Sequence, residues 1–130
     1  MKILVVDDEK IVLESCQAVL EEEGFEVVLV PGADQALRAL AHNDFTVLLI
    51  DVKMPEHDGM YLMQKIKELW PDKPVIVMSG YYTQETIYEA TRMGAATFIA
   101  KPFEPDELVE TIRQVIKKEE HHGKKEGPGN

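Results

Sequence analysis

The chain has 130 residues, of which 45% are hydrophobic and 29% are charged, and its formal net charge is −10 at pH 7. These values are typical of one soluble globular domain with a sizeable core. A protein that binds nucleic acid normally presents a basic face, so we expect no direct nucleic-acid binding by this chain. One cysteine excludes an internal disulfide, and we see no signal peptide and no membrane span, so we expect a cytoplasmic protein.

Short apolar runs alternate with longer segments of helical periodicity along the first half of the chain. Continuous apolar runs of this length are typical of buried parallel strands, whereas apolar residues spaced three and four apart indicate helices. Gly24 stands where a glycine commonly ends a helix. The pattern predicts strands over Lys2–Val6, Phe25–Val30 and Thr46–Ile50, and helices over Glu9–Glu23 and Ala33–His42.

The second half of the chain continues this alternation. Asp58 is the expected N-cap of a helix that runs to Leu69. Pro105 suits the first turn of the last helix, which we expect to end near Lys118. Between these two helices the pattern predicts strands over Val75–Met78 and Ala96–Ala100, and a helix over Thr83–Met93.

Five strand–helix units with buried strands predict an α/β fold in which helices cover both faces of a parallel sheet. With right-handed crossovers, the usual arrangement of five such units is flavodoxin-like, (βα)5, with strand order 2-1-3-4-5. We assign these units to one domain over residues 1–118. Residues 119–130 are polar, glycine-rich and aperiodic, and are predicted to form a disordered tail or linker.

Polar side chains stand at the ends of four of the predicted strands. Open α/β sheets bind ligands at the carboxyl edge, where these strand ends meet. Singly, each of these residue types also has an ordinary role in a cap, a turn or the surface. Together, three carboxylates would repel one another, and Mg²⁺ is the cation that suits a few carboxylates, water and a phosphate oxygen. The residues expected to converge are Asp7, Asp8, Asp51, Ser79 and Lys101.

Two dipeptides add detail to this edge. Lys101 can reach an anion held over Asp51, and the following Pro102 removes a backbone donor and favours a fixed direction, with a cis bond open to it. Ser79 supplies a hydroxyl donor next to the flexible Gly80. A divalent cation and a phosphoryl group are the ligands that this set of groups predicts.

Four motifs then lead to a family. DD follows the first strand, D-x-x-M-P-x-x-D-G begins at Asp51, S-G follows the fourth strand and K-P-F follows the fifth. In this order and at these spacings, they resemble the receiver domain of two-component response regulators. The resemblance covers about Met1 to Lys118, and it is far more specific than any single motif.

The resemblance implies a phosphoryl acceptor and a metal site. Asp51 looks like the phosphoacceptor that attacks a phosphohistidine. Asp8 and Asp51 look like direct Mg²⁺ ligands, and the backbone carbonyl of Lys53 resembles a third. Asp7 would act mainly through metal-bound water. Such phosphoryl transfer depends on alignment and charge neutralisation, so the domain is expected to be a signalling domain with self-catalysed phosphorylation and dephosphorylation rather than an enzyme.

Other positions are implied to respond to the phosphoryl group. Lys101 would pair with it and Ser79 would donate a hydrogen bond to it. Phe98 occupies the position of the family's aromatic switch residue. It would move when Ser79 is drawn inward, and this movement would change the surface formed by the fourth helix, the fifth strand and the fifth helix. Lys53 and Tyr81 resemble positions that tune the rate of dephosphorylation. Phe98 has an alternative role as an ordinary core residue.

The same resemblance implies the partners. The donor would be a sensor histidine kinase or a phosphotransfer protein, and the recipient of the signal would be an output domain or an effector protein. A phosphorylation-dependent homodimer is compatible with this scheme. Whether the chain is a complete regulator or the receiver of a longer one stays open at this stage.

Three alternatives compete with this assignment. A haloacid-dehalogenase-like phosphatase needs a second Asp two residues after its nucleophile, where this chain has Lys53. A flavodoxin-like FMN binder needs a hydroxyl- and glycine-rich phosphate loop after the first strand, where this chain has Asp7, Asp8 and Glu9. A degenerate receiver that acts as a constitutive interaction module would not need the full set of acidic, hydroxyl and lysine groups.

Overall fold

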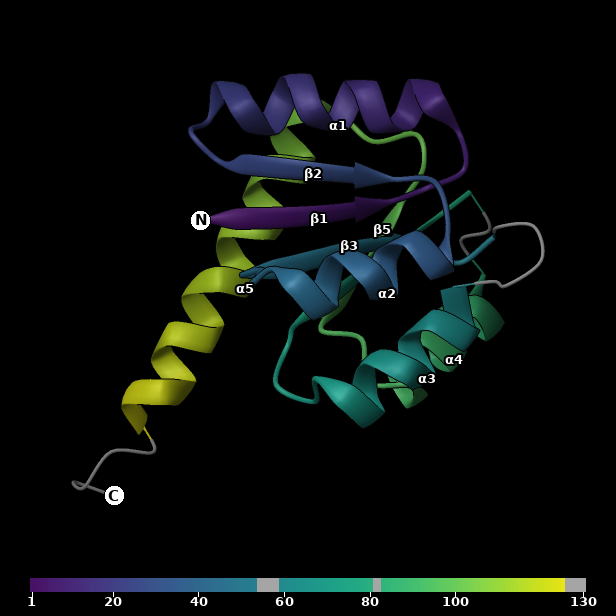
Figure 1. The fold of residues 1–130 in the computed structure, drawn as a ribbon, viewed down its shortest axis with the longest axis vertical. Helices are drawn as coiled ribbons and strands as arrows, with labels where there is room; N and C mark the ends of the chain where they lie inside the picture. The colour runs from purple at the N-terminus through teal and green to yellow at the C-terminus, as the bar shows by residue number, and fades with distance from the viewer. Residues whose placement is uncertain (54–58, 81–82, 126–130) are drawn as a thin grey trace.

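The computed structural model describes the backbone of residues 1–53, 59–80 and 83–125, with side chains described as far as residue 120. Strands and helices alternate throughout these residues (Figure 1). The elements are β1 (Lys2–Val6), α1 (Lys10–Glu22), β2 (Glu26–Val30), α2 (Ala33–His42), β3 (Val47–Asp51), α3 (Gly59–Leu69), β4 (Val75–Ser79), α4 (Gln84–Arg92), β5 (Thr97–Ala100) and α5 (Pro105–Lys125).

The strands of the described residues form one parallel sheet in the order β2-β1-β3-β4-β5. Helices α1 and α5 lie on one face, and α2, α3 and α4 lie on the other (Figure 1). The predicted fold class is therefore confirmed. In this register Asp51 lies beside Met78 and Ser79 beside Ala100, so the ends of β3, β4 and β5 are level at one edge.

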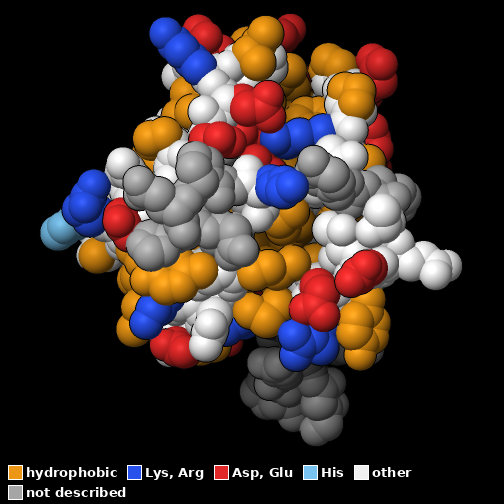
Figure 2. Space-filling view, turned by 90° about the vertical axis from the view of Figure 1, so that its right-hand side faces the viewer, with side chains coloured by type: hydrophobic (Ala, Val, Ile, Leu, Met, Phe, Trp, Pro, Cys, Tyr) orange, Lys and Arg blue, Asp and Glu red, His pale blue; other side chains and the backbone are white. Residues whose placement is uncertain are grey.

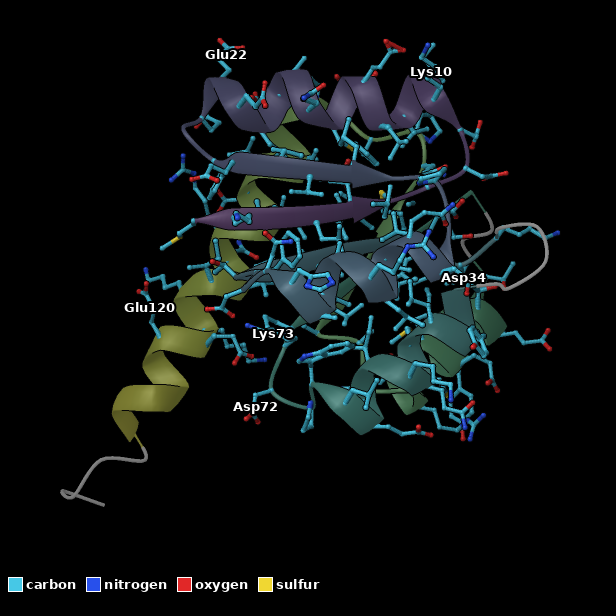
Figure 3. All side chains as sticks on the ribbon, in the orientation of Figure 1. Lys10, Glu22, Asp34, Asp72, Lys73 and Glu120 are labelled. Carbon is cyan, nitrogen blue, oxygen red and sulfur yellow. The ribbon has the colours of Figure 1, made fainter. Side chains whose placement is uncertain are left out.

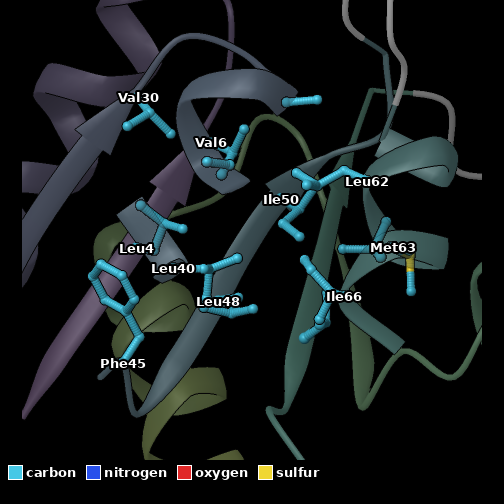
Figure 4. Packing of buried hydrophobic residues seen from close by; sticks show 14 of the residues in the cluster. Leu4, Val6, Val30, Leu40, Phe45, Leu48, Ile50, Leu62, Met63 and Ile66 are labelled. Carbon is cyan, nitrogen blue, oxygen red and sulfur yellow. The ribbon is translucent and has the colours of Figure 1, made fainter. Parts of the chain in front are cut away.

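Two apolar layers hold the helices on the sheet. Strands β3 and β4 are buried along their whole length, which explains why their sequences lack polar alternation. One layer packs under α2, α3 and α4 (Figure 4), and its largest members are Leu4, Phe45, Leu48, Ile50, Leu62, Met63 and Ile66. The other packs under α1 and α5 and includes Ile3, Cys16, Leu20, Leu49, Ile76, Met78, Leu108 and Ile112.

Several helix ends lie where the sequence predicted them. Gly24 and Gly94 follow α1 and α4 with φ of +91° and +93°, a conformation that side chains other than glycine rarely adopt. Thr83 caps α4, where its Oγ1 accepts a hydrogen bond of 3.2 Å from the backbone N–H of Thr86. Pro105 is the first residue of α5.

The end of α5 differs from the prediction. The sequence analysis ended this helix near Lys118 and assigned residues 119–130 to a disordered tail, whereas the helix continues to Lys125. Glu and Lys are good helix formers, and extending an existing helix is easier than starting one, so the lack of apolar periodicity did not end it. Residues 126–130 and the predicted N-cap Asp58 lie outside the described residues. No helix within the described ranges is long and apolar enough to cross a membrane.

Candidate functional site

The candidate site lies at the edge of the sheet where the strands end, on the right-hand side of Figure 1. Asp7 directly follows β1, Asp51 and Ser79 are the last residues of β3 and β4, and Lys101 directly follows β5. The sequence analysis placed Asp51 and Ser79 just past their strands, one residue away from what the structure shows. Figure 2 faces this edge, and acidic and basic side chains lie together near its middle.

Asp7 is a fully buried acid at this edge. Its Oδ1 accepts a hydrogen bond of 2.9 Å from the backbone N–H of Glu9, and its own N–H donates to the carbonyl of Val30 at 3.2 Å. Its Oδ2 lies 2.6 Å from Lys101 Nζ in an ion pair, but no described donor makes a well-aligned hydrogen bond to this oxygen. Asp7 therefore holds a buried negative charge that is only partly satisfied.

Asp51 is the second buried acid. Its Oδ1 accepts a hydrogen bond of 3.2 Å from the backbone N–H of Lys53, and its Oδ2 lies 3.4 Å from Lys101 Nζ. Burial raises the pKa of the Asp51 carboxyl to about 6, and the negative charge of Asp7 adds to this rise. The contacts with Lys53 and Lys101 oppose it only in part. The ionised form of Asp51 is therefore less favourable than that of an exposed carboxyl, and additional positive charge would stabilise it.

Lys101 brings positive charge into contact with the buried acids. Its ammonium lies within 4 Å of three carboxylates, those of Asp7, Glu9 and Asp51, and its side chain is 13% exposed. Burial lowers the pKa of Lys101, but the contacts and charges of the acids outweigh burial, so the net direction is upward. Its backbone N–H donates to the carbonyl of Ser79 at 2.9 Å, and the bond from Lys101 to Pro102 is cis.

Three carboxylates at this edge fit a divalent cation. One oxygen each from Asp7, Asp8 and Asp51 lies within 4.8 Å of the others. Two of these acids, Asp7 and Asp51, are buried, whereas Asp8 is exposed. Burial and the charge of Asp7 also raise the pKa of Asp51. A cation would offset the repulsion between the carboxylates, and an all-oxygen set with room for water suits Mg²⁺.

An open pocket of about 790 Å³ gives access to these groups. Asp8, Glu9, Asp51, Lys53 and Lys101 form its polar side. Its other side is largely apolar and is formed by Ile11, Val12, Pro102 and Phe103 from the start of α1 and the segment between β5 and α5. The site is therefore accessible to a group carried by a large molecule.

Gly59 fixes the start of α3 against the end of β3. A Cβ at this position would lie 2.4 Å from the backbone oxygen of Asp51 and 2.5 Å from the Cα of Val52. The N–H of Gly59 donates to the carbonyl of Val52 at 3.0 Å. The glycine of the D-x-x-M-P-x-x-D-G motif is thus required by a close backbone approach beneath Asp51, a role that the sequence analysis did not assign.

Two of the remaining predicted residues, Ser79 and Phe98, lie in the strands next to this centre. Ser79 is fully buried at the end of β4, and Phe98 is half-buried in β5, where it packs against the layer under α2, α3 and α4. Tyr81 lies outside the described residues. Glu9 contacts Lys101 at the site, but the sequence analysis named it only as the start of a helix and as an argument against an FMN-binding loop.

Comparisons with known proteins agree with this geometry. The family model of the response regulator receiver domain matches residues 3–113. Among curated proteins, a putative NtrX-like response regulator of Rickettsia bellii is 36% identical over 114 residues, which are 86% of this chain and 24% of that protein. The response regulator SaeR of Staphylococcus epidermidis is 39% identical over 109 residues, which are 82% of this chain and 46% of that protein.

Solved structures show the same fold. A receiver domain of the CheY-like type from Methanospirillum hungatei has a TM-score of 0.88 at 32% identity, with 93% of this chain and 97% of that chain covered. NtrX from Brucella abortus, crystallised with ADP, has a TM-score of 0.90 at 32% identity, with 95% of this chain and 28% of that chain covered. This chain thus spans a small part, about a quarter, of the NtrX-type proteins that it matches.

Proposed function

The chain belongs to the family of response regulator receiver domains, and on this premise we propose that it accepts a phosphoryl group on Asp51 and transmits that state as a signal. The observation that carries the proposal is the placement of Asp51 Oδ2, 3.4 Å from Lys101 Nζ, in the lining of an accessible pocket. A nucleophile next to a cation suits a reaction in which the attacked group is an anion.

In the proposed step, a carboxylate oxygen of Asp51 attacks the phosphorus of a phosphohistidine. A P–O bond forms, the P–N bond breaks, and the imidazole leaves with the electron pair and takes a proton from water. The ammonium of Lys101 stabilises the charge on the transferred group, since it already contacts Asp51. The backbone N–H of Lys53 holds the other oxygen of Asp51 and so orients the nucleophile.

Mg²⁺ is the proposed cofactor, held by Asp8 and Asp51 with the carbonyl of Lys53, and by Asp7 through water. When bound, it supplies charge neutralisation for the carboxylates and for the phosphoryl oxygens. The support for it is the group of three carboxylate oxygens within 4.8 Å of one another, together with the burial of Asp7 and Asp51.

The site supports a receiver better than a phosphatase. A haloacid-dehalogenase-like enzyme would need an acid at position 53 to protonate the leaving group, and this chain has a lysine there. Lys53 lines the pocket, where we propose that it tunes access of water to the acyl phosphate. Tyr81 is proposed for the same role.

We propose that Ser79 and Phe98 relay the phosphoryl state to the surface of α4, β5 and α5. Ser79 lies at the site, because its carbonyl accepts the N–H of Lys101, and Phe98 is one strand away in β5. Phe98→Ala should leave labelling of Asp51 unchanged while weakening phosphorylation-dependent binding or self-association. Sedimentation of the phosphorylated and unphosphorylated variant checks this, and coupling equal to that of the wild type would contradict it.

The donor is proposed to be a sensor histidine kinase or a phosphotransfer protein. The apolar wall beside Asp51 supports this, because Ile11 is 73% exposed at the rim of the same pocket and offers contact area to a protein partner. An output domain or effector is proposed to receive the signal, since NtrX-type relatives extend far beyond the matched receiver.

The test is the intact mass of the protein after incubation with Mg²⁺ and acetyl phosphate. We expect a gain of one phosphoryl group that requires Mg²⁺ and is absent in Asp51→Asn. A folded wild-type chain that gains no mass would contradict the proposal and favour a degenerate receiver that binds its partner constitutively.

A further inference from the structure

Glu9 occupies the N-cap position of α1 but does not act as a cap. Its side chain makes no capping hydrogen bond, and the helix begins through its backbone carbonyl, which accepts the N–H groups of Val12 and Leu13 at 3.1 and 3.2 Å. Ser, Thr, Asp and Asn are the usual capping residues because their shorter side chains reach the free N–H groups. The start of α1 therefore does not depend on the Glu9 carboxylate.

The side chain of Glu9 extends over the pocket to Lys101 instead. Its Oε1 lies 3.3 Å from Lys101 Nζ, in an interaction that has the geometry of a hydrogen bond. An ammonium has three N–H donors. In the described site, the three carboxylates of Asp7, Glu9 and Asp51 surround that ammonium. Of these three acids, Glu9 is the one that is largely exposed, with 57% of its side chain open to solvent.

We propose that Glu9 is a positioning residue that restrains Lys101 in the unphosphorylated protein and so slows phosphorylation of Asp51. This inference rests on the proposed function. A phosphoryl group on Asp51 needs a donor from Lys101, and the Glu9 carboxylate competes for the same ammonium. Glu9 also adds negative charge at the mouth through which an anionic donor must enter. Because Glu9 is partly exposed, its hold on Lys101 is weak enough to be broken in each cycle.

Two variants separate the contact with Lys101 from the charge. Glu9→Gln keeps the length of the side chain and removes the charge. Glu9→Asp keeps the charge but is one methylene shorter, so that its carboxylate no longer reaches Lys101. Glu22→Gln is the matched control, because Glu22 lies at the other end of α1, where its exposed side chain points away from the sheet (Figure 3). This control changes the net charge by the same amount as Glu9→Gln.

The experiment measures the rate of acetyl phosphate labelling by intact mass, at a Mg²⁺ concentration that saturates each protein. Saturation keeps any change of metal affinity out of the rate. We expect Glu9→Gln and Glu9→Asp to be labelled about two- to fivefold faster than the wild type, the scale of a partly exposed ion pair. Glu22→Gln should be labelled at the wild-type rate.

Each other outcome has a definite meaning. A wild-type protein that gains no phosphoryl group would remove the proposed function and this inference with it. Normal labelling of the wild type with no acceleration in Glu9→Gln would overturn the inference alone. Acceleration in Glu9→Gln but not in Glu9→Asp would show repulsion of the donor without restraint of Lys101, and would also overturn it.

A second measurement tests the contact without any phosphoryl transfer. Urea unfolding midpoints are compared for Glu9→Gln, Lys101→Met and the double variant without Mg²⁺. We expect the two single shifts not to add, because Glu9 has no ammonium to contact once Lys101 is replaced. Additive shifts would show that Glu9 and Lys101 do not interact in solution, which contradicts the proposal.

Discussion

The two edges of the sheet each carry a lysine paired with a carboxylate, but in opposite surroundings. At the carboxyl edge, Lys101 is 13% exposed and pairs with Asp7, which is fully buried. At the opposite edge, Lys73 pairs with Asp44, whose side chain is 92% exposed, and also donates to the carbonyl of Phe45 at 2.8 Å (Figure 3). Both pairs join a lysine to an aspartate, but they differ in the access of water and in the number of acids around the lysine.

The difference appears in the direction of the pKa shifts. The hydrogen bond and charge of Lys73 lower the pKa of Asp44, as expected for an exposed ion pair. Burial raises the pKa of Asp51 to about 6, although Lys101 is close by. An exposed ion pair contributes little to stability, whereas the buried cluster of acids carries a cost that an added cation would reduce.

Replacement of each lysine in turn should show the difference between the two pairs most clearly. Lys101→Met leaves Asp7 and Asp51 buried without their cation, and we expect it to lower the free energy of unfolding by about 3 kcal/mol without Mg²⁺. Lys73→Met should have a much smaller effect, because water solvates Asp44 in its absence. Urea unfolding at pH 7 checks both, and equal losses for the two variants would contradict the contrast.

Substitution of two glycines by alanine distinguishes a steric clash from an unfavourable backbone conformation. Gly59→Ala would place a Cβ 2.4 Å from the oxygen of Asp51, so we expect a loss of about 2–3 kcal/mol in stability. Gly24→Ala has open space but φ of +91°, so we expect a loss of about 1 kcal/mol. Thermal unfolding of both variants measures the order. Gly59→Ala should also slow labelling of Asp51, whereas Gly24→Ala should not.

Asp51→Asn should stabilise the protein in the absence of Mg²⁺. The pKa of Asp51 is raised from 3.8 to about 6 on folding, so between these values the folded state binds more protons and the free energy of unfolding falls as the pH rises. The gain from Asn should therefore be absent below this window and complete above it, at about 3 kcal/mol. Unfolding at pH 4 and pH 7 checks the sign. Mg²⁺ should stabilise the wild type more than the variant.

The smallest expected effect is at the exposed pair. The lowered pKa of Asp44 means that its contribution to stability is present above the ordinary pKa of the carboxyl and is lost as the pH falls. Asp44→Asn should therefore destabilise slightly at pH 7 and leave the stability unchanged in acid. Salt should reduce even the effect at pH 7, because the pair is screened. A difference in stability between the wild type and the variant that salt does not reduce would contradict this prediction.

The sequence predicted the fold and most of the site because both depend on local patterns. Buried parallel strands are continuous apolar runs, and a residue at the end of such a run must lie at the carboxyl edge. These patterns alone are enough to locate Asp7, Asp51 and Lys101. They do not reveal Glu9, whose role depends on a contact with a residue 92 positions away. The roles of all the site residues in the chemistry, Asp51 and Lys101 included, stay predictions.

By itself, the sequence determined the order of the elements, the parallel sheet and the residues at its carboxyl edge, since strand periodicity and the placement of polar residues act along the chain. Only the tertiary structure decided which of those residues are deprived of water. Asp7 and Asp51 are buried, whereas Asp8 is exposed. The close approach of the backbone requires a glycine at position 59, and the side chain of Glu9 reaches Lys101 as a third acid. Solvent exclusion and the meeting of distant side chains arise only when the helices pack on the sheet, and they turn a set of common residues into a site.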